Sequence, residues 1–248
     1  MPPSQRLAYL LILGLLFLLV SRGQVRAQAS PAAGSVSAIQ GAVTITRSGK
    51  ILTAAYGTPV QVGDRIDTAA KSQVTLTLTD GTQMDLTEST TIVVDQNDLN
   101  PDGSRAATQV SLMGGLLHSL VRHAPGNFPN YEVHTPNAVA AARGTDYTTD
   151  YIKGVERKEH SGCREYSDVA VYDGEVEVSN PQNPTAGSIK LKKGNKTTVP
   201  CGLLLAPAIA VGPLIGMGAA GAAAAGAVAG VAVAVSGGNN PSPVTPAQ

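Results

Sequence analysis

Two cysteines and one nearby histidine are the residues with the greatest intrinsic reactivity in this sequence. Cys163 lies three residues after His160, inside the charged stretch Lys153–Glu165, and Cys201 follows 38 positions later. A thiolate nucleophile needs a positioned base and a sheltered pocket, and a solvated cluster of charges predicts neither. The alternative is a disulfide between Cys163 and Cys201, which depends on the compartment in which the chain folds.

Histidine and carboxylate pairs are the next candidates for catalysis. His118 and His123 are five residues apart, so a regular strand would direct them to opposite faces and they make a poor metal pair. Asp146 and Asp150 would share one face of a strand, but no neighbouring motif indicates a cleft around them. The sequence contains no Gly-x-Ser-x-Gly, His-Glu-x-x-His or phosphate-loop signature. We therefore predict a protein that is not an enzyme and uses no cofactor.

One loop has the spacing of a calcium site. Asp98, Asn100 and Asp102 place side-chain oxygens at positions 1, 3 and 5, and Gly103 occupies position 6. Position 12 is Gln109, where such loops carry a bidentate glutamate. Without that carboxylate we favour a Pro-Asp-Gly turn between two strands, and calcium binding is the alternative.

The amino terminus predicts export. Leu7–Val20 is an apolar run that follows Arg6, and Ala27-Gln28-Ala29 provides small residues at a cleavage site before Ser30. A bilayer core needs about 20 apolar residues, so residues 1–29 are interpreted as a signal peptide, with an uncleaved anchor as the alternative. Cleavage would leave 15 basic against 18 acidic side chains, which argues against a nucleic-acid-binding surface. In an oxidising compartment the Cys163–Cys201 disulfide is favoured.

Alternation of apolar and polar residues predicts strands from Ser35 to Val199. Val74, Leu76 and Leu78 alternate with threonines, which places one face of a sheet inward. Three glycine-containing turns, Asp80-Gly81, Gly114-Gly115 and Asp173-Gly174, are predicted to close β-hairpins between such runs. The expected fold is all-β, a single domain at residues 35–200 made of short antiparallel strands in a sandwich or a short β-coil.

The order of several short motifs resembles FecR domains between about residues 35 and 200. The motifs are Gly41-Ala42-Val43, Val62–Thr68 with Gly63-Asp64, Leu78–Thr82 with Asp80-Gly81, Gly115-Leu116-Leu117, Thr135-Pro136-Asn137-Ala138, Arg143-Gly144-Thr145 and Tyr172–Val178.

Each of these motifs also has a reading in terms of the fold alone. Gly63-Asp64 and Asp80-Gly81 are typical of turns, Pro136 favours an extended start to the next strand, and Gly144 permits a bulge beside a neighbouring backbone. We expect Arg143 to pair with a carboxylate at the sheet edge, either Asp64 or Asp67. Direct contact of the Arg143-Gly144-Thr145 motif with a ligand is the alternative.

The resemblance implies a location and a role. FecR is a periplasmic sensor that receives a signal from an outer-membrane siderophore transporter and passes it across the inner membrane to control a sigma factor. Before residue 35 the present sequence has only a signal-like segment and no cytoplasmic regulatory domain. We therefore expect a binding or sensing domain in the periplasm or cell envelope whose partner is an envelope protein or another ligand, rather than direct control of a sigma factor.

The C-terminal segment has a different composition. Residues 203–235 are uncharged and rich in glycine and alanine, with Gly212 and Gly216, and again Gly226 and Gly230, four residues apart. This spacing allows close helix packing in a membrane, although the basic residues before it oppose the positive-inside tendency. Membrane attachment and self-assembly into homo-oligomers through this helix-like segment are the two hypotheses, and residues 236–248 are expected to be disordered. Self-assembly would make the chain a structural envelope protein.

Overall fold

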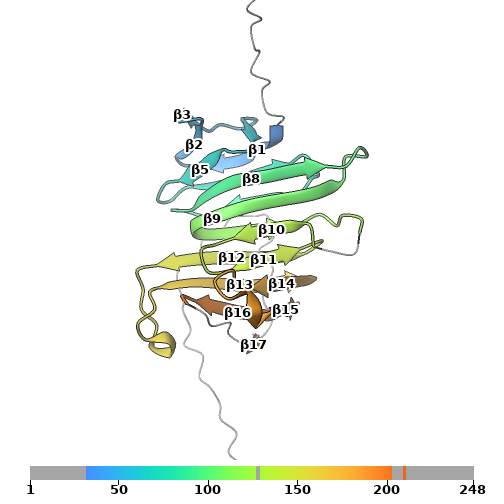
Figure 1. Ribbon diagram of the computed structural model, residues 1–248. Helices are drawn as coiled ribbons and strands as arrows, with labels where there is room; N and C mark the ends of the chain where they lie inside the picture. The colour runs from blue at the N-terminus through green and yellow to red at the C-terminus, as the bar shows by residue number, and fades with distance from the viewer. Residues whose placement is uncertain (1–31, 127–128, 203–208, 211–248) are drawn as a thin grey trace, which may run out of the picture. The chain divides into compact units, whose positions relative to one another are not determined.

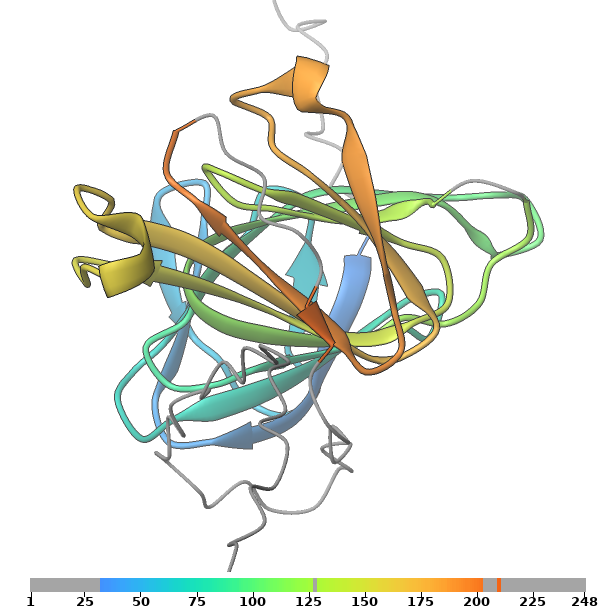
Figure 2. The ribbon, with the colours of Figure 1, turned by 90° about the horizontal axis from the view of Figure 1, so that it is seen from below.

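The computed structural model describes residues 32–126, 129–202 and 209–210, and in this part strands are the main secondary structure (Figure 1). The all-β prediction is confirmed. Helical structure here is limited to two three-residue 3-10 turns, η1 (Lys158–His160) and η2 (Pro184–Ala186). Figure 2 shows them at the tips of two hairpins. The strands are β1 (Ala32–Gln40), β2 (Val43–Arg47), β3 (Lys50–Thr53), β4 (Pro59–Gln61), β5 (Arg65–Thr68), β6 (Gln73–Leu78), β7 (Gln83–Leu86), β8 (Thr91–Leu99), β9 (Arg105–Leu120), β10 (Tyr131–His134), β11 (Val139–Ala142), β12 (Asp146–Lys153), β13 (Glu165–Asp173), β14 (Glu175–Ser179), β15 (Ser188–Lys192), β16 (Asn195–Pro200) and β17 (Ile209–Ala210).

These strands form two sheets that share β9. Sheet A has the order β4-β1-β6-β7-β9-β12-β13-β16-β17. Sheet B has the order β3-β2-β5-β8-β9-β10-β11-β14-β15. The β9–β10 pair is parallel and the other pairs are antiparallel. In Figure 1, β9 accordingly lies between the N-terminal strands and the C-terminal strands.

The inward side chains of both sheets pack into one hydrophobic core. Val74, Leu76 and Leu78 of β6 are buried while the threonines between them are partly exposed, as the alternation predicted. Ile66 of sheet B and Leu117 of sheet A belong to the same cluster of buried residues. Aliphatic side chains, which each contribute about 1.5 to 3 kcal/mol when fully buried, make up most of this core, and Tyr131 and Tyr147 are buried with them.

The predicted hairpin at Gly114-Gly115 is wrong, because β9 continues through it. Residues Arg105–Gly114 pair with β8 in sheet B, and Gly115–Leu120 pair with β12 in sheet A. Gly115 has a φ of +83°, a left-handed conformation that glycine adopts without strain. Gly115 therefore allows one strand to pass from one sheet to the other.

The predicted hairpin at Asp173-Gly174 is also wrong, whereas that at Asp80-Gly81 is confirmed. β6 and β7 pair with each other across Asp80-Gly81. β13 pairs with β12 and β16 in sheet A, but β14 pairs with β11 and β15 in sheet B. Gly174, with a φ of +82°, is thus a second crossing point between the sheets.

The predicted terminal segments lie largely outside the described residues. This applies to the signal peptide at 1–29, to residues 236–248, and to the apolar segment 203–235 except for Ile209–Ala210, which pair with β16 as the short strand β17. Within the described ranges, no helix has the length and apolar character that crossing a membrane requires.

Candidate functional site

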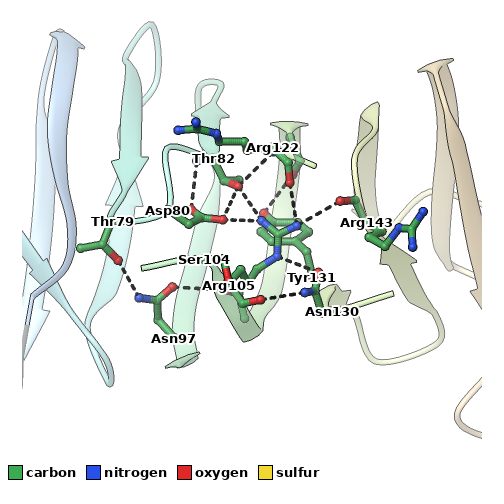
Figure 3. A network of polar contacts seen from close by, with 12 residues as sticks. Thr79, Asp80, Thr82, Asn97, Ser104, Arg105, Arg122, Asn130, Tyr131 and Arg143 are labelled. Atoms are coloured by element: carbon green, nitrogen blue, oxygen red, sulfur yellow. Dashed lines mark hydrogen bonds and ion pairs between the residues drawn. The ribbon is translucent and has the colours of Figure 1, made fainter. Parts of the chain in front are cut away.

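A buried arginine lies at the start of β9, where the two halves of the fold meet. Arg105 is 1% exposed, and its guanidinium lies over the ring of Tyr131 at 5.7 Å from the ring centroid. A guanidinium has five N–H donors, and Arg105 makes five hydrogen bonds (Figure 3). The acceptors are Asn130 Oδ1 at 2.9 Å, Asp80 Oδ2, Thr82 Oγ1 at 2.8 Å, the Arg122 carbonyl at 2.8 Å and the Arg143 carbonyl at 3.2 Å.

Asp80 provides the charge that balances Arg105. It lies in the β6–β7 turn and is 8% exposed. Its carboxylate also accepts hydrogen bonds from the Thr82 backbone N–H at 2.9 Å and the Thr82 hydroxyl at 2.8 Å. A buried ion pair is tolerated when its remaining hydrogen-bonding groups are satisfied, and this pair meets that condition.

Several residues of the predicted motifs converge around Arg105. Arg143 supplies its carbonyl, and Thr145 forms backbone hydrogen bonds with Val121 at 2.9 and 3.2 Å. A Cβ atom on Gly144 would lie 2.7 Å from His123 Nδ1 and 3.0 Å from His123 Cα, and one on Gly174 would lie 2.8 Å from the Gly144 carbonyl oxygen. The glycines of these motifs therefore permit a close approach of three backbone segments.

The predicted ion pair of Arg143 with Asp64 or Asp67 is wrong. Asp64 pairs with Arg47 at 2.6 Å because β2 lies next to β5, and Asp67 pairs with Arg65 at 2.9 Å within β5. Among the described residues, no ion pair involves the Arg143 side chain. Arg105 differs from these arginines because its own side chain is buried together with that of its partner Asp80, and the sequence reasoning missed it.

The other motif residues form turns at separate places. Gly63 has a φ of +88°, and Asp64 accepts a hydrogen bond from the Gln61 N–H at 2.8 Å. Thr135 Oγ1 accepts from the Ala138 N–H at 2.8 Å in the β10–β11 turn, where Pro136 is exposed. These contacts fit the predicted turns.

Two depressions adjoin the Arg105 centre. The first has a volume of about 290 Å³ and is lined by Asp80, Arg105 and Arg122 among others, and the second has a volume of about 240 Å³ and includes Arg143 and Lys190. His123 lines both. The guanidinium groups of Arg122 and Arg143 point in different directions in Figure 3. Because all five donors of Arg105 are already used, the geometry supports a structural role for this centre.

Residues 64–177 match the family model described as FecR protein. Residues 64–177 therefore correspond to a FecR domain. The matched range begins at Asp64 and includes Asp80, Arg105 and the Arg143-Gly144-Thr145 motif.

Solved structures with a similar fold were also found. Two crystal structures, at 1.65 and 2.50 Å resolution, are of a provisionally assigned anti-sigma factor from Parabacteroides distasonis. Each is 18% identical to this chain, with TM-scores of 0.44 and 0.45 and a coverage of 59% of both chains. This chain therefore spans less than two thirds of the length of those proteins. No curated protein matches the sequence.

The two cysteines of the chain form a disulfide. Cys163 and Cys201 are bonded, with their Cα atoms 5.7 Å apart, and no cysteine of the described residues is free. The bridge connects the η1 loop to the end of β16. Because Cys163 is in the disulfide, His160 has no thiolate to activate. Its ring packs beside that of Tyr166, with 6.0 Å between the centroids.

The residues of the predicted calcium loop hydrogen-bond within their own hairpin. Asp102 accepts hydrogen bonds from the Ser104 N–H at 2.9 Å and the Ser104 hydroxyl at 2.6 Å, and Asn100 Nδ2 donates to Ser104 Oγ at 3.0 Å. The Asp98 carboxylate accepts from Gln96 Nε2 at 2.5 Å. In the ranges that the structure covers, no group of three or more His, Cys, Asp or Glu side chains is arranged to hold a metal ion. The arrangement therefore favours the turn.

The two carboxylates predicted to share a strand face have different surroundings. Asp146 contacts His118 Nε2 at 2.6 Å. Asp150 lies opposite Asp168 on β13, and Asp168 forms a bidentate ion pair with Arg157 at 2.9 and 2.6 Å. Burial, together with the charge of Asp168, raises the pKa of Asp150 to about 6, against a small opposing effect of Arg157.

Asp150→Asn is expected to stabilise the FecR domain at neutral pH. A raised pKa contributes stability that is present below the unfolded value of 3.8 and is lost as pH rises through about 6. At pH 7.5 the buried carboxylate is ionised and costs stability, so the neutral amide should increase the free energy of unfolding by about 1 to 2 kcal/mol. Urea unfolding at pH 4 and pH 7.5 measures this, and the gain should be absent at pH 4. Asp173→Asn, at an exposed position, is the control and should change neither value; an equal gain at both pH values would contradict the prediction.

Proposed function

We propose that this chain is an exported, non-enzymatic FecR domain that binds a protein partner in the bacterial cell envelope as part of sensing. The FecR match supports the sensing role. The centre around Arg105 is saturated with internal hydrogen bonds, so partner binding is assigned to the edges of the sheets.

The observation that carries this proposal is the edge of sheet B. β3 pairs with β2 on one side only, and all four of its residues are exposed. Ile51 is 74% exposed, and Tyr56, in the turn after β3, is 78% exposed. An edge strand has free backbone N–H and C=O groups that can pair with an extended segment of another protein, and its apolar side chains add contact area.

Site-specific photo-crosslinking in the native host tests this proposal. A photoreactive phenylalanine analogue at Tyr56 of the full chain is expected to give a discrete adduct with an envelope protein. The same analogue at Val155, which is 51% exposed, is the control and should give none. Figure 1 shows the β12–β13 hairpin, which carries Val155, at the opposite end of the described fold from β3. Equal adducts at both positions, or none at either, would refute the assignment of this edge.

Export is tested separately on the same material. We expect the mature chain to begin at Ser30 and to be recovered from the envelope fraction. Recovery of the unprocessed chain from the cytosol would contradict the proposal. Detergent-resistant oligomers of the full chain that disappear when residues 203–248 are deleted would instead support the alternative, a self-assembling structural protein.

A further inference from the structure

A second polar cluster lies on the outer face of sheet A, around His118. This residue is on β9 and its side chain is 7% exposed. Asp85 of β7 lies directly opposite it, and its Oδ2 is 3.1 Å from His118 Nδ1. On the other side, Asp146 Oδ1 of β12 is 2.6 Å from His118 Nε2. Both ring nitrogens of one histidine thus contact carboxylate oxygens from different strands.

The two contacts determine which protonation state of the His118 ring fits the structure. An ionised carboxylate only accepts hydrogen bonds, and a neutral imidazole has one N–H and one lone pair. A neutral His118 could therefore donate to only one of the two aspartates, and its other nitrogen would place a lone pair against a carboxylate oxygen. The observed arrangement is satisfied only by the doubly protonated, positively charged ring.

His134 on sheet B provides a contrast within the same molecule. Its Nε2 is 2.6 Å from Glu132 Oε2, but its Nδ1 is 3.1 Å from the amide nitrogen of Gln109. A neutral ring satisfies both contacts, since Nε2–H donates to Glu132 and Nδ1 accepts from Gln109. Of these two histidines, His118 is the one held between two acceptors.

The groups around His118 support the charged form. Thr75 of β6 donates to Asp85 Oδ1 at 2.6 Å, and Tyr172 of β13 places its ring edge-on at 6.1 Å between centroids. Burial acts to lower the pKa of His118, but the hydrogen bonds with Asp85 and Asp146 outweigh it and raise that pKa above 6.5. Burial acts to raise the pKa of Asp85, but the hydrogen bonds from His118 and Thr75 outweigh it and keep that pKa below 3.8.

His118 lies between two groups of strands, so its protonation affects how they are held together. In sheet A, β7 belongs to the N-terminal group of strands and β12 to the C-terminal group, and β9 joins them. We propose that Asp85, His118 and Asp146 form a proton-operated clasp that holds the two halves of sheet A together and loosens as the surroundings become more alkaline. This inference does not depend on the proposed partner or on the edge at β3.

Hydrogen exchange of the full chain between pH 6.5 and 9, corrected for the intrinsic exchange rate, tests the clasp. This range lies above the titration of Asp150 at about 6. A raised histidine pKa gives stability that is complete below the unfolded value and is lost as pH rises through the folded value. Protection of the β7 and β12 amides should therefore fall, by about tenfold for each unit that separates the folded and unfolded pKa values of His118.

Three variants make the test specific. His118→Gln should remove the pH dependence in this range. Asp146→Asn should also remove it while keeping the contact, because a neutral ring can then donate to Asp85 and accept from the amide, as His134 does. His134→Gln is the matched control and should keep the wild-type profile. A flat wild-type profile, or a decline that persists in both His118→Gln and Asp146→Asn, would overturn the proposal.

Discussion

Arg105→Met is expected to lower the free energy of unfolding by about 3 to 5 kcal/mol, because removing one partner leaves a buried charge without compensation. Asp80 would keep its hydrogen bonds from Thr82 but lose its counter-ion. The carbonyls of Arg122 and Arg143 would also lose the donor that joins them. Equilibrium urea unfolding with the disulfide intact measures the change.

Two further variants separate this effect from a general sensitivity to arginine loss. Arg65→Met removes an ion pair with Asp67 in which the two side chains are 54% and 29% exposed, so water can replace the lost contacts and the loss should be clearly smaller. Asp80→Asn combined with Arg105→Met removes the buried charge and should recover part of the stability. A loss for Arg105→Met no larger than that for Arg65→Met would contradict a central role for Arg105.

Gly115→Ala is expected to cost about 2 to 5 kcal/mol, from left-handed backbone strain and from overpacking. With a φ of +83°, the added Cβ would lie 2.4 Å from Thr90 Oγ1 and 2.7 Å from Thr90 Cα. The hydroxyl could rotate away, but the main-chain atom cannot move without displacing the chain at the β7–β8 turn. Urea unfolding of the variant against the wild type gives the cost.

Gly114→Ala is the matched control for Gly115→Ala. Gly114 is not in the left-handed region, and the atoms nearest to its added Cβ are the flexible end of Lys153 at 3.5 Å. This substitution should therefore change stability little. If the two variants were equally destabilised, the passage of β9 between the sheets would not depend on Gly115.

The strands were predictable because alternation is a local property. Val74, Leu76 and Leu78 face the core as expected, since a strand directs successive side chains to opposite faces. The partners of a strand are not local. Gly115 and Gly174 have the positive φ that a hairpin turn requires. The same positive φ also occurs where a chain crosses from one sheet to the other. The sequence therefore located these turns without revealing where the chain goes next.

The candidate site was less predictable, for a related reason. Register shifts interrupt the pairing of β8 with β9 near Arg105, so the alternation that marks Val110 and Leu112 as inward does not extend back to it. Its acceptors come from three turns distant in sequence. Arg143 was assigned a carboxylate partner from its charge, whereas the fold uses its carbonyl. The one sequence signal for a buried cation was the position of Arg105, a few residues before the inward-facing Val110 and Leu112.

The sharing of β9 by both sheets also constrains the order in which the strands can assemble. If the chain crosses the membrane from its N-terminus, β1–β8 emerge first, and neither sheet then has its middle strand. One edge of β9 pairs with β8 and β7, which precede it in the chain. Its other edge stays open until β10 and β12 have also emerged. A polypeptide arrested before residue 146 would retain open sheet edges, which can pair with strands of other chains.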